Sequence, residues 1–246
     1  MQEGTAAIVV IGNEILNGST QDTNSHWLVT RLNDLGMEVG RILVIPDVMD
    51  TIVHEVGSLA REYEFVITTG GIGPTPDDLT REAVARAAGR KLVLNQEAAE
   101  MIRASHGWKA TETQLTMAEL PEGCRLIGNP HTGAPGFIVD NVYVFPGIPK
   151  LLHTMFDLVA EDFRRGSFFQ ETIRVMVGES KFAHVLREAG ERFPEVEIGS
   201  YPKYEDIAWV EVRVRCRNEE MVKSAASWLR DKLAEIEHHH RPSKED

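Results

Sequence analysis

FVITTGGIGPTPDDLT, at residues 65–80, joins an apolar run to a turn rich in glycine, proline and acids. The run at 65–67 is typical of a buried β-strand. Gly70, Gly71 and Gly73 have no Cβ, so backbone N–H groups there can turn toward a bound anion without a steric penalty. The segment therefore predicts a strand that ends at an anion-binding turn.

Two adjacent acids close this turn. Pro74 and Pro76 stiffen the chain, and Asp77 and Asp78 come directly before residues 79–84, whose spacing is helical. A carboxylate at a helix N-terminus can act as a cap, worth about 1 kcal/mol, but a cap explains only one acid. Since hard oxygen ligands suit magnesium, the pair is more typical of a divalent cation that meets a phosphate.

Length and composition indicate an ordinary globular protein. The chain has 246 residues, 42% of them hydrophobic, which is enough for one large and one small domain with normal cores. The net charge of −12 and the pI near 5.3 speak against broad binding to nucleic acid or anionic membranes, because phosphate backbones need a basic face. A local nucleotide pocket stays compatible with this charge.

The sequence also predicts a compartment. Cys124 and Cys216 are far apart and lack the spacing of metal ligands, so we expect free thiols in a reducing environment. The amino terminus lacks the pattern of a signal peptide, and no run of about 18 apolar residues occurs. We therefore expect a soluble, cytoplasmic protein.

A second loop follows the first apolar run. Residues 5–11 are typical of a fully buried strand, and Gly12 and Glu14 come directly after it. In an open α/β sheet, ligand-binding groups gather where strands end and helices begin. Glu14 is either a metal or ligand contact or the acceptor of a structural hydrogen bond. Asn24 could face the ligand or cap the helix that follows.

The order of elements predicts the sheet. Strands at 5–11, 38–45 and 65–67 alternate with amphipathic helices through short connections, which requires parallel strands with right-handed crossovers. Residues 137–145 are typical of a hairpin that turns at Asp140.

Two further loops carry glycines and polar groups. Gly133 lies in the loop before the hairpin, and Gly147 and Lys150 join the last hairpin strand to a helix. The start of a helix is a natural anion site. Lys150 is therefore either a phosphate contact or a solvated side chain.

The composition changes after residue 165, and we predict domains at 1–166 and 167–237 with a disordered tail at 238–246. Residues 207–216 alternate between apolar and charged, as in a half-exposed antiparallel strand, and 219–236 is a long amphipathic helix. The order βαββα predicts a small α+β domain of split ferredoxin-like type.

Four ordered motifs resemble, in order and spacing, the amino-terminal part of competence/damage-inducible protein A (CinA). They are GNEIL with DTN at 12–24, TTGGIGPTPDD at 68–78, GAPGF at 133–137 and FPGIP at 145–149. The same module occurs at the amino terminus of eukaryotic FAD synthases and is related to molybdopterin-binding domains. The match is close from residue 5 to 165 and looser beyond.

The resemblance implies a three-layer α/β/α molybdopterin-binding-like fold with a mostly parallel sheet. It also implies a pyrophosphatase dependent on Mg²⁺, Mn²⁺ or Co²⁺ that acts on ADP-ribose or a related dinucleotide such as FAD. Carried over by position, the phosphate-cradling loop comprises Thr69, Gly70, Gly71 and Gly73. Asp77 and Asp78 match its acidic end.

The chain departs from the family pattern in two ways. Asn13 stands where many relatives have Thr, which affects contacts of the first loop. We also expect no carboxy-terminal deamidase domain, so nicotinamide-mononucleotide deamidation does not carry over.

Two functions stay open. In the first, Asp77 or Asp78, with Glu14, holds the cation, and the nucleotide contacts Gly12, Asn24, Gly133, Gly147 and Lys150 besides the glycine turn. In the second, the same residues bind a pterin or nucleotide without turnover. In either case we expect a homo-oligomer, a dimer or a trimer.

Overall fold

The computed structural model describes residues 2–105, 110–204 and 209–240. The chain divides into two compact units, Met1–Arg165 and Gly166–Asp246. The first unit contains two hydrophobic cores and the second unit contains one.

The first unit is built on one six-stranded sheet with the order β2-β1-β3-β8-β7-β6. Its strands are β1 (Gln2–Ile11), β2 (Glu38–Ile45), β3 (Tyr63–Thr69), β6 (Arg125–Ile127), β7 (Gly136–Val139) and β8 (Val142–Phe145). The four strands from β2 to β8 pair in parallel, whereas β7 pairs antiparallel with both of its neighbours. This confirms the predicted mostly parallel sheet and the hairpin.

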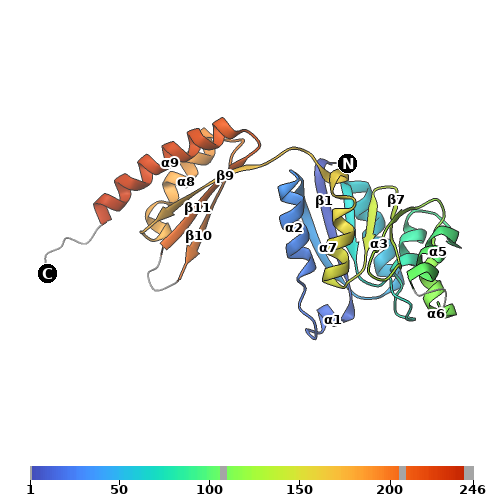
Figure 1. Cartoon of the computed structure of the whole chain (residues 1–246). Helices are drawn as coiled ribbons and strands as arrows, with labels where there is room; N and C mark the ends of the chain where they lie inside the picture. The colour runs from blue at the N-terminus through green and yellow to red at the C-terminus, as the bar shows by residue number, and fades with distance from the viewer. Residues whose placement is uncertain (1, 106–109, 205–208, 241–246) are drawn as a thin grey trace. The chain divides into compact units, whose positions relative to one another are not determined.

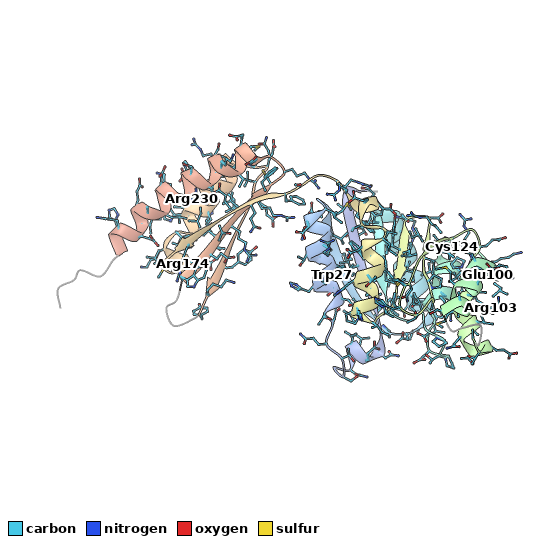
Figure 2. The ribbon with its side chains drawn as sticks, viewed as in Figure 1. Trp27, Glu100, Arg103, Cys124, Arg174 and Arg230 are labelled. Carbon is cyan, nitrogen blue, oxygen red and sulfur yellow. The ribbon has the colours of Figure 1, made fainter. Side chains whose placement is uncertain are left out.

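Helices cover both faces of this sheet (Figure 1). On one face, α2 (Asn24–Asp34) and α7 (Pro149–Asp157) enclose one core. On the other face, α3 (Met49–Glu62) and α4 (Thr80–Ala87) enclose a second. Trp27, labelled on α2 in Figure 2, is partly buried and packs against the first of these cores.

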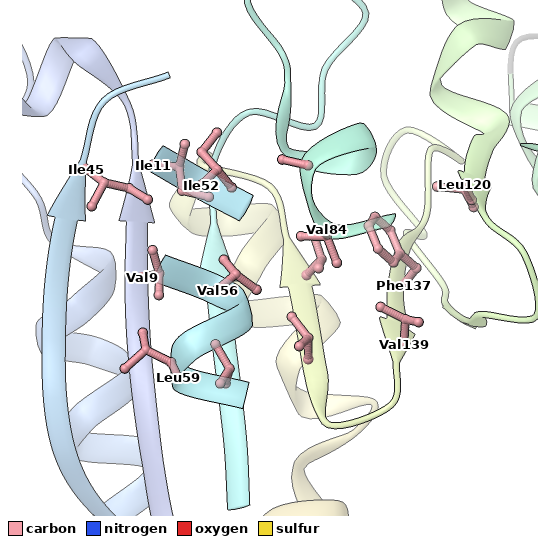
Figure 3. Close-up of a cluster of buried hydrophobic side chains, with 14 of the residues drawn as sticks. Val9, Ile11, Ile45, Ile52, Val56, Leu59, Val84, Leu120, Phe137 and Val139 are labelled. Atoms are coloured by element: carbon pink, nitrogen blue, oxygen red, sulfur yellow. The ribbon is translucent and has the colours of Figure 1, made fainter. Parts of the chain in front are cut away.

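Strand β1 shows why its sequence is almost continuously apolar. Ala7, Val9 and Ile11 contribute to the core beneath α3 and α4, and the intervening Ile8 and Val10 to the core beneath α2 and α7. A central parallel strand is covered on both faces, so both sets of side chains must be apolar. Figure 3 shows Val9 and Ile11 among the side chains of the α3 side. Each fully buried side chain of this size contributes about 1.5–3 kcal/mol.

Shorter elements complete the first unit. They are α1 (Asn13–Leu16), β4 (Leu92–Leu94), α5 (Gln96–Ser105), α6 (Glu112–Leu115), the 3₁₀ turns η1 (Thr116–Ala118) and η2 (Ala160–Phe163), and β5 (Glu119–Pro121). β4 and β5 form a separate antiparallel pair. Asn95 caps α5, since its Oδ1 accepts a hydrogen bond from the Ala98 amide at 3.0 Å.

The second unit is a small α+β domain, as predicted. Its elements are β9 (Phe169–Val175), η3 (Glu179–Lys181), α8 (Ala183–Arg192), β10 (Glu197–Lys203), β11 (Trp209–Cys216) and α9 (Glu219–His240). β11 lies between β10 and β9 and is antiparallel to both, which is the split βαβ arrangement. Burial alternates along β11, with Val210, Val212, Val214 and Cys216 buried.

The predicted disorder from residue 238 is wrong for residues 238–240, because α9 continues to His240. His239 Nδ1 lies 2.7 Å from the Glu235 carbonyl oxygen, one turn earlier. The rest of the predicted tail, 241–246, lies outside the described residues. Within the described ranges, none of the helices is both long and apolar enough to cross a membrane.

Candidate functional site

Three of the predicted loops meet at the carboxyl edge of the parallel strands. Gly12 follows β1, and its amide donates to the Ile45 carbonyl of β2 at 3.1 Å. Gly70 follows β3, and its amide donates to the Phe145 carbonyl of β8 at 3.1 Å. A Cβ on Gly147 would lie 3.5 Å from the Gly70 Cα. The parallel order of the strands thus brings together residues far apart in the sequence.

Glycine is required at two positions of the turn. Gly70 has φ +106°, and a Cβ there would lie 2.1 Å from the Ile11 carbonyl oxygen. Gly71 has φ +65°, and its Cβ would lie 2.3 Å from Thr80 Oγ1. A side chain at either position meets an unfavourable backbone conformation and a steric clash.

Thr80, the first residue of α4, fixes the direction of two peptide groups in this turn. Its Oγ1 donates to the Gly70 carbonyl at 2.9 Å, and its amide donates to the Gly71 carbonyl at 3.0 Å. In a trans peptide the C=O and the following N–H point in opposite directions. The amides of Gly71 and Ile72 therefore point away from Thr80, and within the described ranges neither donates a hydrogen bond. Such a pair of amides can bind an anion.

Asn24 and Thr69 support the loops. Asn24 is 7% exposed, and its Nδ2 donates to Thr69 Oγ1 at 3.1 Å and to the Gly147 carbonyl at 2.7 Å. Thr69 Oγ1 in turn donates to the Pro146 carbonyl at 3.0 Å. These bonds hold the loops after β3 and β8 together, so both side chains position the site.

Asp77 and Asp78 both accept hydrogen bonds from Thr75. The Thr75 amide donates to Asp78 Oδ2 at 2.8 Å, and Thr75 Oγ1 lies 2.5 Å from both Asp77 Oδ1 and Asp78 Oδ2. The hydrogen bond from Thr75 lowers the pKa of the exposed Asp77 carboxyl. Helix α4 begins at Thr80 with Leu79 as its N-cap and without a side-chain cap. Neither acid caps the helix.

Each of the two carboxylates keeps one oxygen free of hydrogen bonds within the described ranges, and such an oxygen can serve as a cation ligand. Asp77 Oδ2 and Asp78 Oδ1 accept no hydrogen bond from the described residues. Among all the residues that the structure describes, no group of three or more His, Cys, Asp or Glu side chains is placed to hold a metal ion by itself. Magnesium is commonly held by one or two carboxylates, with water and substrate phosphate as its other ligands.

Glu14 lies at the first loop. It is exposed on α1, and a Cβ on Gly12 would lie 2.5 Å from its Oε1. Its carboxylate is therefore folded over the loop after β1.

Sequence reasoning missed Asp47, which follows β2. Its Oδ2 accepts a hydrogen bond from the Asn13 amide at 2.8 Å, and its Oδ1 would lie 3.5 Å from a Cβ on Gly71. This carboxylate thus lies between the first loop and the glycine turn. Its position at the carboxyl end of a predicted parallel strand was the available signal.

Sequence reasoning also missed Arg81, in the first turn of α4. Its Nη2 donates to the Gly73 carbonyl at 3.0 Å, and its Nη1 donates to the Thr116 carbonyl. Burial lowers the pKa of the guanidinium, and the charges of Asp78 and Glu119 oppose this effect. An arginine at helical spacing carries no signal of such a role.

The remaining two predicted residues lie beside α5 and on α7. Gly133 packs against α5, where a Cβ would lie 2.6 Å from the Met101 carbonyl oxygen. Lys150 is exposed in the first turn of α7, three residues after Gly147. Its ammonium group has no hydrogen-bond or ion-pair partner among the described residues.

The first unit is thus an open α/β domain with an anion-compatible turn at the carboxyl edge of its sheet. Residues 7–165 match the family described as probable molybdopterin binding domain. Residues 167–240 match the middle domain of FAD synthase. The chain belongs to the molybdopterin-binding-domain family.

Relatives and a solved structure agree with this family. A protein of Archaeoglobus fulgidus is 37% identical over 92% of this chain and 96% of its own length. A probable FAD synthase of Caenorhabditis elegans is 32% identical over 95% of this chain, which spans only 50% of that protein. The structure of CinA from Thermoplasma acidophilum, described as of unknown function, has a TM-score of 0.62 at 33% identity and covers 65% of this chain and 99% of its own. The predicted resemblance to CinA is confirmed.

Proposed function

We propose that this protein is a divalent-cation-dependent pyrophosphatase that hydrolyses ADP-ribose, or a related dinucleotide such as FAD, at its diphosphate. The observation that carries the proposal is the pair of outward amides of Gly71 and Ile72, fixed by Thr80, close to Asp77 and Asp78 along one loop. A diphosphate can accept hydrogen bonds from the two amides and, at the same time, share a cation with the two acids.

The charges around the turn indicate why a cation is needed. Glu14, Asp47, Asp77 and Asp78 place four carboxylates on these loops, against one buried cation, Arg81. A diphosphate that approaches them meets repulsion. A bound divalent cation supplies offsetting charge and increases the acidity of a water molecule.

The residues of the chain have distinct roles in this proposal. Asp77 and Asp78 would hold the cation, because each has a carboxylate oxygen without a hydrogen bond from any described residue. The amides of Gly71 and Ile72 donate hydrogen bonds to phosphoryl oxygens as negative charge develops on these oxygens. One such preorganised donor lowers the activation barrier by about 3 kcal/mol. Asn24 keeps the surrounding loops in place. Water adds to one phosphorus, and the bridging oxygen leaves with the other phosphate.

The similarity to probable FAD synthases favours a nucleotide ligand. The family description instead favours a second candidate, a protein that binds a pterin or nucleotide without turnover. Fold and phosphate-binding turn suit both candidates equally, because the same site can serve binding or catalysis.

The direct test is to incubate the purified chain with ADP-ribose and Mg²⁺, Mn²⁺ or Co²⁺ and to separate the products by chromatography. The expected products are AMP and ribose 5-phosphate, and FAD would correspondingly give AMP and FMN. Binding of ADP-ribose without formation of AMP, while a known hydrolase works in the same buffer, would support the binding protein instead.

A further inference from the structure

Arg81 carries a positive charge behind the glycine turn. Arg81 is 8% exposed, and its guanidinium donates hydrogen bonds to the carbonyl of Gly73 on one side and of Thr116 on the other. Its Nε is buried and has no hydrogen-bond partner among the described residues. The guanidinium therefore joins the turn to the start of η1, and one of its N–H groups is left without a hydrogen-bond acceptor among those residues.

A buried guanidinium is unfavourable unless an anion compensates for it. Within the part of the chain that the structure describes, no carboxylate oxygen forms a contact ion pair with Arg81. Asp78 and Glu119 act on its charge from a longer distance. Arginine stays protonated even when buried, so this charge persists beside the Gly73 carbonyl, within the glycine turn.

We propose that Arg81 is the residue that makes this turn selective for a diphosphate over a monophosphate. It acts as a positioning residue that does not touch the ligand. It fixes Gly73 through its hydrogen bond and adds a fixed positive potential, which favours the ligand with more negative charge. The proposal rests on the diphosphate site of the proposed function, but it concerns binding and not turnover.

The test uses the full chain and isothermal titration calorimetry with ADP and AMP in the presence of Mg²⁺. Arg81→Met removes the charge at similar volume, and Arg81→Lys keeps the charge but loses the forked donor geometry. Arg86→Met is the matched control, because Arg86 lies on the same helix, is 54% exposed and pairs with Glu82. Thermal unfolding of each variant shows that it is folded.

We expect Arg81→Met to weaken ADP binding about 10- to 30-fold and AMP binding about threefold, since one unit charge acts more strongly on the more highly charged ligand. Arg81→Lys should stay within about threefold of the wild type for ADP. Two results would show a purely structural role and overturn the proposal. The first is an equal loss of affinity for ADP and for AMP in Arg81→Met, and the second is an Arg81→Lys variant that binds ADP as weakly as Arg81→Met.

If Arg81→Met does not fold, the comparison of Arg81→Lys with the wild type at rising salt concentration replaces it. Retained preference for ADP in the Lys variant supports the proposal, and its loss overturns it. A wild-type protein that binds ADP but cleaves no ADP-ribose contradicts the proposed hydrolysis and leaves this inference standing. A wild-type protein that does not bind ADP overturns both.

Discussion

Gly70 illustrates how one residue fixes the candidate site. Its positive φ and the nearby Ile11 carbonyl leave no room for a side chain. We expect Gly70→Ala to lower the free energy of unfolding by about 2–4 kcal/mol. The control is Gly57→Ala in helix α3, where the Cβ makes ordinary contacts at 3.7 Å and should stabilise the helix by up to about 1 kcal/mol. Urea unfolding measures both, and equal effects would contradict the packing described for Gly70.

Asn24 is a second residue at which one particular side chain is needed, because its amide group donates hydrogen bonds to Thr69 and Gly147. Asn24→Ala leaves the Gly147 carbonyl without its donor and should cost about 1–3 kcal/mol of unfolding free energy. Asn24→Asp should cost more, because a buried carboxylate cannot donate and would face the Gly147 carbonyl oxygen. Thermal unfolding distinguishes the two. An Asp variant as stable as the wild type would show that the amide does not bridge the loops.

Sequence could predict some of these residues and not others. Glycines next to adjacent acids are visible as a pattern, so Gly70, Gly71 and Asp77 can be predicted as candidate site residues. The roles of Thr80 and Arg81 depend on which carbonyl each one reaches after folding, and at helical spacing they look like ordinary surface positions.

Among the elements, helices α2 and α7 contact each other through an aromatic stack. The rings of Trp27 and His153 lie 3.9 Å apart at 14°, and burial lowers the pKa of His153, opposed by the charge of Asp157. The folded state therefore binds fewer protons than the unfolded state near the ordinary pKa of 6.5. This contribution to stability is present above that pH and is lost as the pH falls below it.

The corresponding prediction concerns His153→Phe. This variant keeps an aromatic ring against Trp27 but cannot be protonated, so its stability should vary less with pH between about 5 and 7 than that of the wild type. Unfolding by urea at several pH values measures the difference. Identical pH profiles would show that His153 does not titrate differently in the folded state.

Elements with a strong pattern were predictable, and short ones were not. β1 is apolar on both faces because two helical layers cover it, and this gives a continuous signal. The strand β5 has three residues and no usable periodicity, so its pairing with β4 was not predicted. The end of α9 was missed because consecutive histidines and charges resemble a solvated tail.

At the scale of the whole molecule, each compact unit has hydrophobic cores of its own, two in the first unit and one in the second, which indicates two independently folding units. We expect a fragment of residues 1–165 to fold with the same secondary structure as in the full chain. The CinA structure from T. acidophilum supports this, because 99% of that chain matches 65% of this one. Circular dichroism and size exclusion check the fragment, and a molten or aggregated product would contradict the expectation.

The net charge of −12 is a property of the whole molecule. An acidic protein that binds a diphosphate needs a local source of positive charge.

The central claim is that Asp77 and Asp78 recruit a cation to a diphosphate at the glycine turn. Electron paramagnetic resonance of Mn²⁺, titrated into the full chain with a methylene-bridged ADP analogue, tests it most directly. The comparison is between the wild type, the double variant Asp77→Asn with Asp78→Asn, and the exposed control Asp34→Asn.

We predict that the analogue increases Mn²⁺ affinity in the wild type and in Asp34→Asn, and that the double variant binds Mn²⁺ about tenfold more weakly or worse. Mn²⁺ binding by the double variant that equals the wild type, with the analogue present, would contradict the account.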